Sequence, residues 1–366
     1  MSSPANSVNM LISKRLLAAA LALAPLAALA APPADLGQRL ADGYVRPAVA
    51  ELAQRAESLE KTLDAWCRQG GGPDGAPGVR EAFGQTALAW SGVEFLRFGP
   101  LVQGNRYERL VFWPDTRGVM QRQVRALLAQ ADPAALAPGA LAGRSVALQG
   151  LPALEYVLYD APGLVDAPAG DASGYACRYA VAVAANIAGV AGELRQAWSA
   201  QGDFGSQFTA PSADSDLYRS QQEVAAEAVK ALSTGLQFVR DVKLAPMLGD
   251  SPQAARPKRA AFWRSGMAVP MLAASVRGMG AFYDAGGYRY AADADWIDAS
   301  LRGELDRAAA ALAAVDVPLQ QAAADADAWQ RLALAALILK NAKDIVDQHV
   351  APALGVTIGF NALDGD

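Results

Sequence analysis

Histidine is almost missing from this chain: among 366 residues only His349 carries an imidazole. A zinc peptidase needs two or three histidines, or histidine together with carboxylates, at fixed spacing, and the motif H-E-x-x-H does not occur. A serine or cysteine triad would have to use this same histidine, and no G-x-S-x-G is present. The sequence therefore argues against hydrolytic catalysis.

The chain also lacks basic blocks after its N-terminal segment, long apolar runs and strand-like alternation. Its net charge is −5 and its pI is near 5.1, so nucleic acid is not an expected partner. The glycine-rich run at 70–78 is not followed by the Lys-Ser/Thr pair of a phosphate-binding loop. After residue 30 no apolar run is long enough to span a membrane, which takes about 20 residues.

The first thirty residues have the composition of a secretory signal. Lys14 and Arg15 precede an apolar run over 16–29, and small residues flank position 30 in Ala28-Leu29-Ala30-Ala31. A membrane anchor is the alternative, but the run is shorter than the ~20 residues of a spanning helix. The sequence predicts cleavage after Ala30 and a mature protein in the periplasm.

Apolar residues make up 52% of the chain and recur mainly at helical spacing. The spacing predicts helices over about 36–63, 79–98, 119–128, 151–158, 174–199, 216–243, 294–315 and 322–348, with a kink or break at Pro47, and another helix beginning near Phe262. The polar stretch 202–216 is the best candidate linker. The predicted fold is all-α, with two packed helical bundles over 31–205 and 206–366.

The stretch from Gln149 to Glu155 predicts the sharp start of a helix. Gly150 permits a turn that other residues resist, and Pro152 suits the first helical position. Glu155 would then lie in the first turn, near the positive end of the helix dipole. This electrostatic preference is one explanation of the glutamate, and a role in a polar site is the other.

The same stretch resembles the signature G-x-H-x-x-E of the imelysin-like proteins, a family of bacterial envelope proteins associated with iron uptake and first described as peptidases. Gly150 and Glu155 match, but Pro152 occupies the histidine position and offers no ligand or base. The chain looks like a branch with G-L-P-A-L-E. Other short blocks match as well, among them W-x-x-x-E at 90–94, W-P-D at 113–115 and W-R-S-G at 263–266. The resemblance implies an all-α envelope protein.

Glu94 is the second acidic residue of interest, since it lies one turn after Trp90 and close to an apolar stripe. A buried carboxylate is costly unless it is paired or binds something. One reading is an ion pair with Arg97. The other, which the resemblance favours, is a site shared with Glu155.

Three more residues are candidates for this site. Asp115 is expected mainly to cap the helix after it, with a site role as the alternative. Tyr156 offers a phenol to a polar site or lines the core. Arg264 is expected to form a surface ion pair, to pair with an acidic group of the first half, or to bind an anion. If a metal binds, Glu94 and Glu155 are the expected ligands, and carboxylates suit iron or another hard cation.

The two cysteines, Cys67 and Cys177, form a disulfide or remain two buried thiols. An oxidising compartment favours the disulfide.

The resulting hypothesis is a non-catalytic binding or accessory protein of iron acquisition, with other iron-uptake or envelope proteins as partners. The alternative is a structural or interaction protein of the cell envelope without a metal site. A metallopeptidase is less favoured because Pro152 replaces the motif histidine.

Overall fold

The computed structural model describes residues 31–168, 174–322 and 325–359, and all regular structure within these ranges is helical. The predicted all-α fold is therefore confirmed. The predicted signal peptide at 1–30 lies outside the described residues. Within the described ranges, no helix has the length and apolar character needed to cross a membrane.

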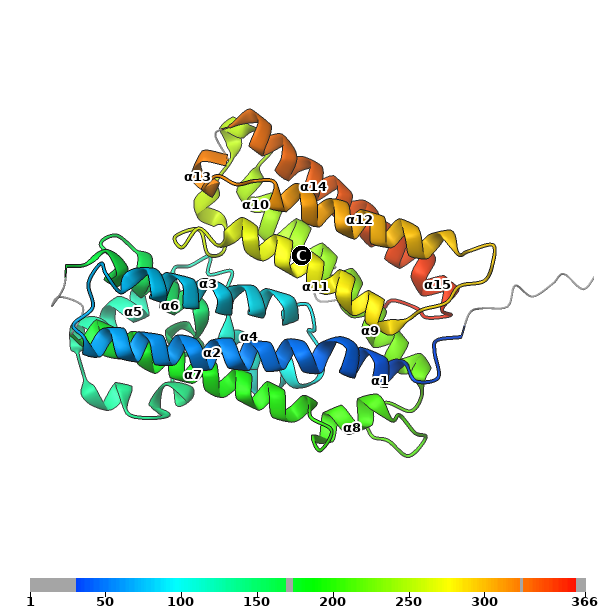
Figure 1. Ribbon diagram of the computed structural model, residues 1–366, viewed down its shortest axis with the longest axis horizontal. Helices are drawn as coiled ribbons and strands as arrows, with labels where there is room; N and C mark the ends of the chain where they lie inside the picture. The colour runs from blue at the N-terminus through cyan, green and yellow to red at the C-terminus, as the bar shows by residue number, and fades with distance from the viewer. Residues whose placement is uncertain (1–30, 169–173, 323–324, 360–366) are drawn as a thin grey trace, which may run out of the picture.

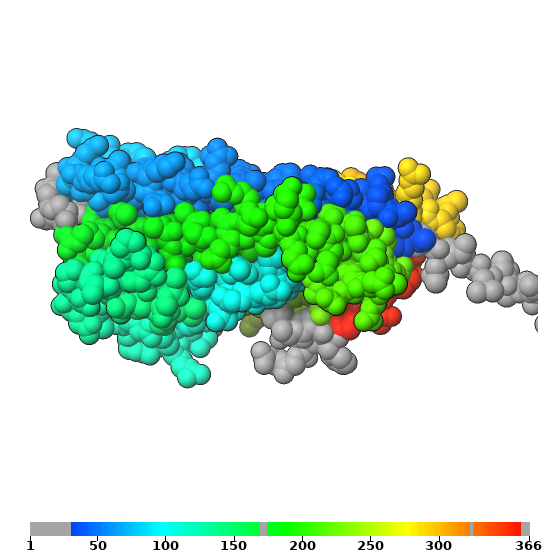
Figure 2. Space-filling view, turned by 90° about the horizontal axis from the view of Figure 1, so that it is seen from below, coloured from blue at the N-terminus to red at the C-terminus, as the bar shows by residue number. Residues whose placement is uncertain are grey.

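The first half is built around three long helices, with α2 in contact with both α3 and α7. Figures 1 and 2 show α2 and α7 side by side along one face of the molecule. The helices of this half are α1 (Leu36–Leu40), α2 (Arg46–Arg68), α3 (Ala76–Val93), α4 (Arg106–Leu110), α5 (Val119–Gln130), α6 (Gly150–Tyr159), α7 (Tyr175–Trp198) and α8 (Asp203–Thr209).

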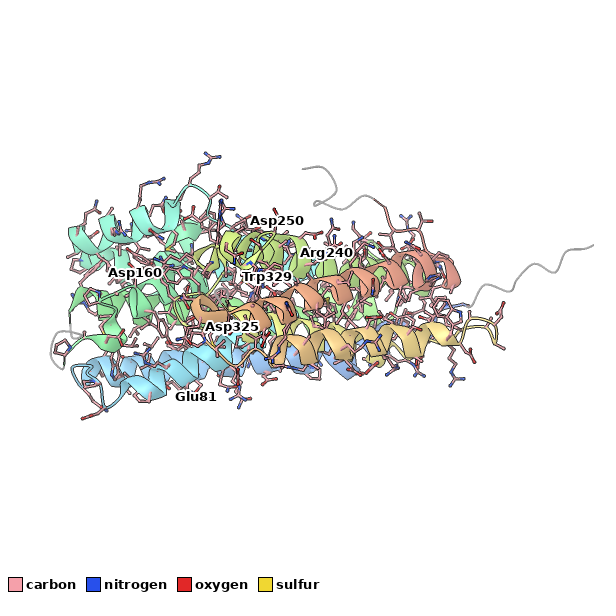
Figure 3. The ribbon with its side chains drawn as sticks, turned by 90° about the horizontal axis from the view of Figure 1, so that it is seen from above. Glu81, Asp160, Arg240, Asp250, Asp325 and Trp329 are labelled. Atoms are coloured by element: carbon pink, nitrogen blue, oxygen red, sulfur yellow. A yellow bond between two sulfur atoms is a disulfide. The ribbon has the colours of Figure 1, made fainter. Side chains whose placement is uncertain are left out.

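The second half packs α11 on α12, α12 on α14 and α14 on α9. The indole of Trp329 on α14, labelled in Figure 3, donates to the Leu248 carbonyl at 3.0 Å. The helices are α9 (Gln221–Gln237), α10 (Ala245–Leu248), α11 (Ala268–Gly286), α12 (Trp296–Ala313), α13 (Leu319–Ala322), α14 (Ala326–Ile345) and α15 (Ala351–Ala353).

Three π-helical segments continue these helices where the sequence predicted uninterrupted or kinked ones. Ala41–Val45 joins α1 to α2, and Pro47 is the second residue of α2. Phe238–Leu244 extends α9 into α10, and Val346–Val350 follows α14. A π turn adds a residue to the helix and changes which side chains face the neighbouring helix.

The predicted helix start at Phe262 is wrong. Phe262 has a φ of 58°, a left-handed conformation that the interior of a right-handed helix excludes, and 262–266 form turns. The helix begins only at Ala268.

The two halves meet where α11 packs against α3. One hydrophobic core extends through both halves, with buried residues contributed by all the long helices. The predicted domain boundary after residue 205 falls inside α8, and the division into two domains stays a prediction.

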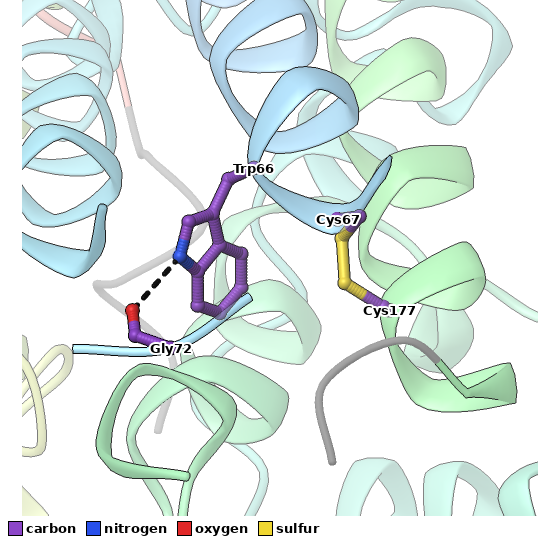
Figure 4. Close-up of a disulfide and its surroundings, with 4 residues drawn as sticks. All are labelled: Trp66, Cys67, Gly72 and Cys177. Carbon is purple, nitrogen blue, oxygen red and sulfur yellow. Dashed lines mark hydrogen bonds between the residues drawn. A yellow bond between two sulfur atoms is a disulfide. The ribbon is translucent and has the colours of Figure 1, made fainter. Parts of the chain in front are cut away.

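Cys67 and Cys177 form a disulfide, as predicted, with their Cα atoms 5.8 Å apart. The bond joins the last turn of α2 to the first turn of α7 (Figure 4). Beside it, the Trp66 indole donates to the Gly72 carbonyl at 3.1 Å, which ties the loop after α2 to the helix.

Candidate functional site

A pocket of about 670 Å³ opens between the two halves, and we call it the seam pocket. The first half contributes the segment 112–121, with Pro152 and Glu155 of α6. The second half contributes Asp241, Val242, Pro246 and the segment 258–264. Of the residues predicted from sequence, the structure brings Asp115, Pro152, Glu155 and Arg264 to this one pocket.

Gly150 fixes the start of α6, which puts Pro152 and Glu155 on the pocket wall. Its φ is 77°, and a Cβ there would lie 2.3 Å from the Leu110 carbonyl oxygen. The helix begins at Gly150 itself, so Pro152 is its third residue and Glu155 its sixth. The prediction that Glu155 lies in the first turn is therefore wrong, and the dipole at the helix start does not explain this glutamate.

Glu155 is a buried carboxyl, 3% exposed, and its hydrogen bonds come from the other half of the molecule. Its Oε1 accepts from the Ser265 amide at 2.9 Å and from the Ser265 hydroxyl at 2.8 Å. Burial raises the pKa of this carboxyl, while the Ser265 bonds and the Arg264 charge act in the opposite direction. No described residue forms an ion pair with Glu155.

Arg264 closes one side of the site by pairing with an acidic group of the first half, one of the roles predicted for it. Its Nε donates to Asp160 Oδ1 at 2.6 Å, and Asp160 is labelled in Figure 3 just after α6. The guanidinium also stacks 5.3 Å from the Tyr156 ring centroid. The hydroxyl of Tyr156 accepts from Arg125 at 2.6 Å, so this phenol is engaged beside the pocket and does not line it.

Asp115 caps α5, the role that the sequence favoured. Its two carboxylate oxygens accept from the amides of Val119 and Met120, each at 2.8 Å. These are first-turn amides that have no partner within the helix. The third carboxylate of the pocket, Asp241, pairs with Arg240.

Glu94 lies elsewhere and does not line the seam pocket. It is 2% exposed, and its two oxygens accept from the Lys243 ammonium at 2.5 and 2.6 Å. Ser275 adds a third hydrogen bond. The structure therefore does not bring Glu94 and Glu155 together. The expected pair with Arg97 does not form either, because the buried ammonium of Lys243 takes the carboxylate.

Sequence reasoning missed the partners Lys243, Ser265 and Ser275. Lys243 follows Val239 by four residues, which places it on the apolar face of the predicted helix. A lysine at such a position indicates a buried ion pair, so this partner could have been predicted. Ser265 belongs to the W-R-S-G block at 263–266, so the resemblance could have pointed to it. Ser275 carried no such signal, because its role depends on which helix faces it.

The donor set does not fit a tightly held cation. In the part of the chain that the structure describes, no group of three or more His, Cys, Asp and Glu side chains is placed to hold a metal ion. The single histidine, His349, packs edge-on against Trp296 at 4.8 Å between ring centroids. Hard cations take six or more oxygen ligands, and the seam pocket offers Glu155 as its one carboxylate without a cationic or capping partner.

Comparisons with known proteins agree with this architecture. The family model described as Imelysin, a family also named peptidase M75, matches residues 43–346. No curated protein matches the chain. Several solved structures are similar to it, including the following two. An imelysin-like protein from Psychrobacter arcticum 273-4 shares 20% identity at a TM-score of 0.68, over 88% of this chain and 96% of that one.

The second solved structure is described as a "putative iron-regulated protein A precursor" from Parabacteroides distasonis ATCC 8503. It shares 13% identity at a TM-score of 0.69, over 88% of this chain and 97% of that one. At such identities the two structures support the fold, and the family model carries the assignment. Because that model spans most of the sequence, this chain belongs to the imelysin family.

Proposed function

We propose that this protein is a non-catalytic binding component of iron acquisition in the periplasm, and that the seam pocket holds its ligand. The observation that carries the proposal is Glu155, a buried carboxyl without an ion-pair partner on the wall of a pocket formed by both halves. Ser265 satisfies one oxygen by hydrogen bonds, but burial without a counter-charge disfavours the ionised carboxylate, and a bound cation would offset that cost. The name of the Parabacteroides protein supports the connection with iron.

The pocket supports binding more than hydrolysis. Pro152 occupies the wall where the family signature has histidine, and it supplies neither a base nor a metal ligand. Asp115 accepts hydrogen bonds from two backbone amides, and Asp241 forms an ion pair with Arg240. Nothing among these side chains is placed to activate water beside Glu155.

If the ligand contains iron, most of the oxygen atoms that coordinate the iron must come from a bound chelator and not from the protein. One carboxylate is far short of the roughly six oxygens that a hard cation takes. The rim also carries Lys258 and Arg259, two exposed cations that form no ion pair with any described residue. We propose that iron reaches this pocket as a chelate whose organic anion faces these cations.

Equilibrium dialysis of the mature chain, from residue 31 onward, against iron(III) citrate tests the proposal. We expect saturable, stoichiometric retention of iron that Glu155→Gln weakens by about 10-fold. Glu60→Gln is the matched control, because it removes the same charge from a residue that lines none of the described pockets. Absence of retention, or equal affinity of Glu155→Gln and wild type, would refute the proposal and favour the structural or interaction role.

A further inference from the structure

A second pocket, of about 590 Å³, lies next to the seam pocket and shares Trp113, Pro114 and Val242 with it. We call it the aromatic pocket. Its size is within the range of small-molecule sites, roughly 300–1,000 Å³. Five aromatic side chains line it: Phe95, Phe98, Tyr107, Trp113 and Phe238.

Arg97 is the cation of this pocket. Its guanidinium lies between two rings, 4.2 Å from the Tyr107 centroid and 3.7 Å from the Phe238 centroid. Nη2 donates to the Tyr107 hydroxyl, while no described residue accepts a hydrogen bond from the buried Nε or from Nη1. No described carboxylate forms an ion pair with it, in contrast to Arg264 with Asp160.

The acidic groups nearby do not neutralise Arg97. Glu94 is three residues away, but Lys243 already neutralises it. Three charged side chains also line the pocket: Glu108, Glu227 and Lys230. Glu108 is exposed, and burial raises the pKa of Glu227, which lowers its negative charge at a given pH. Among the described residues, the guanidinium therefore remains a stacked, half-buried cation without a counter-ion.

Two hydroxyls add hydrogen-bonding capacity to the wall. Burial raises the pKa of Tyr107, so its hydroxyl stays protonated at neutral pH. Its oxygen accepts from Arg97, while its own proton has no acceptor among the described residues. The hydroxyl oxygen of Thr234 is buried and has no hydrogen-bond partner in the part of the chain that the structure describes. A buried polar group of this kind costs stability until something satisfies it.

We infer that the aromatic pocket binds a small aromatic carboxylate, with the carboxylate on Arg97 and Tyr107 and the ring among the aromatic side chains. A guanidinium fork matches the geometry of a carboxylate, and the charge-assisted bonds are stronger than neutral ones. A monoanion balances the stacked guanidinium of Arg97, and the exposed Lys230 on the pocket wall adds a second positive charge. A phosphate dianion would bring a second negative charge that the guanidinium of Arg97 does not balance. This inference is independent of iron and of Glu155.

Isothermal titration calorimetry of the mature chain with 2-naphthoate tests the inference, with 2-naphthamide as the neutral analogue of the same shape. We expect saturable naphthoate binding and an amide that binds about 10-fold more weakly, because only the carboxylate gains the ionic bonds. Lack of naphthoate binding up to about 1 mM, or equal affinities for acid and amide, would overturn the inference.

Two variants locate the site. Arg97→Gln should weaken naphthoate binding by about 10-fold, and Tyr107→Phe, which keeps the ring, by about 3-fold. Arg277→Gln is the matched control, since it loses the same charge from an exposed position of α11 outside every described pocket. Circular dichroism verifies that each variant is folded. If folded Arg97→Gln and Tyr107→Phe both bind like wild type, the carboxylate does not bind at this position.

Discussion

Glu94 and Lys243 form an ion pair inside the core, and this pairing explains why the fold can bury both charges. The side chains are 2% and 7% exposed, and Ser275 also donates to the carboxylate. Removal of one partner leaves the other charge buried and uncompensated, which typically costs 3–5 kcal/mol.

We therefore expect Glu94→Gln to lower the free energy of unfolding by about 3–5 kcal/mol in urea titrations. The double variant Glu94→Gln with Lys243→Met removes both charges and should recover a large part of that loss. Strictly additive losses in this double-mutant cycle would show that the two side chains are not coupled.

Glu155 makes stability depend on pH in the direction opposite to a salt-bridged acid. Burial raises its pKa in the folded state, so the folded protein binds more protons than the unfolded chain between the ordinary pKa and the raised one. Stability therefore falls as pH rises through that window, and the loss is complete above the raised pKa.

Glu155→Gln removes this titration and keeps an oxygen that accepts from Ser265. The melting temperature of the variant minus that of metal-free wild type should increase between about pH 4 and the raised pKa, and then level off. Glu227 and Asp284, whose pKa values are also raised, are present in both proteins and cancel in the difference. A difference that is independent of pH would contradict the raised pKa of Glu155.

At the scale of elements, the disulfide ties α2 to α7 across 110 residues of sequence. These two helices also pack against each other through many contacts away from the disulfide. The cross-link therefore stabilises the fold mainly by lowering the conformational entropy of the unfolded chain.

The double variant Cys67→Ala with Cys177→Ala should unfold with a free energy lower by about 4–5 kcal/mol. Wild-type protein measured with a reducing agent should match it. Two alkylatable thiols in the unreduced protein, found by mass spectrometry, would contradict the disulfide.

At the scale of the whole molecule, the two halves approach closely because glycines stand where α3 meets α11. A Cβ on Gly278 would lie 3.1 Å from the Gly92 Cα and 2.5 Å from the Tyr44 hydroxyl oxygen. That hydroxyl donates to the Gly92 carbonyl and joins the start of the first half to the same contact.

Gly278→Ala should therefore lower the free energy of unfolding by about 1–3 kcal/mol, because backbone and hydroxyl have to move apart. Gly280→Ala, on the same helix, is the control. Its Cβ would meet Leu305 at 3.9 Å, an ordinary contact, so the better helix propensity of alanine should stabilise by about 0.5–1 kcal/mol. Equal effects of the two substitutions in thermal melts would show that the contact at Gly278 is not tight.

The sequence by itself determined the all-α fold, most of the helices and the family resemblance, because these depend on local periodicity and on short motifs along the chain. It favoured the disulfide over two free thiols but did not decide between them, because the distance between the cysteines is a tertiary property. It also indicated the capping role of Asp115, which concerns amides four and five residues away. It placed the start of α6 too late, because the close approach of Gly150 to Leu110 is a tertiary contact.

Only the tertiary structure decided the partners of the two glutamates. Lys243 is 149 residues from Glu94, and Ser265 is 110 residues from Glu155. Helical spacing predicts which face of a helix is apolar, but the packing of the two halves determines which polar atoms meet across it. The same packing separates Glu94 from the seam pocket and places no described carboxylate in an ion pair with Arg97.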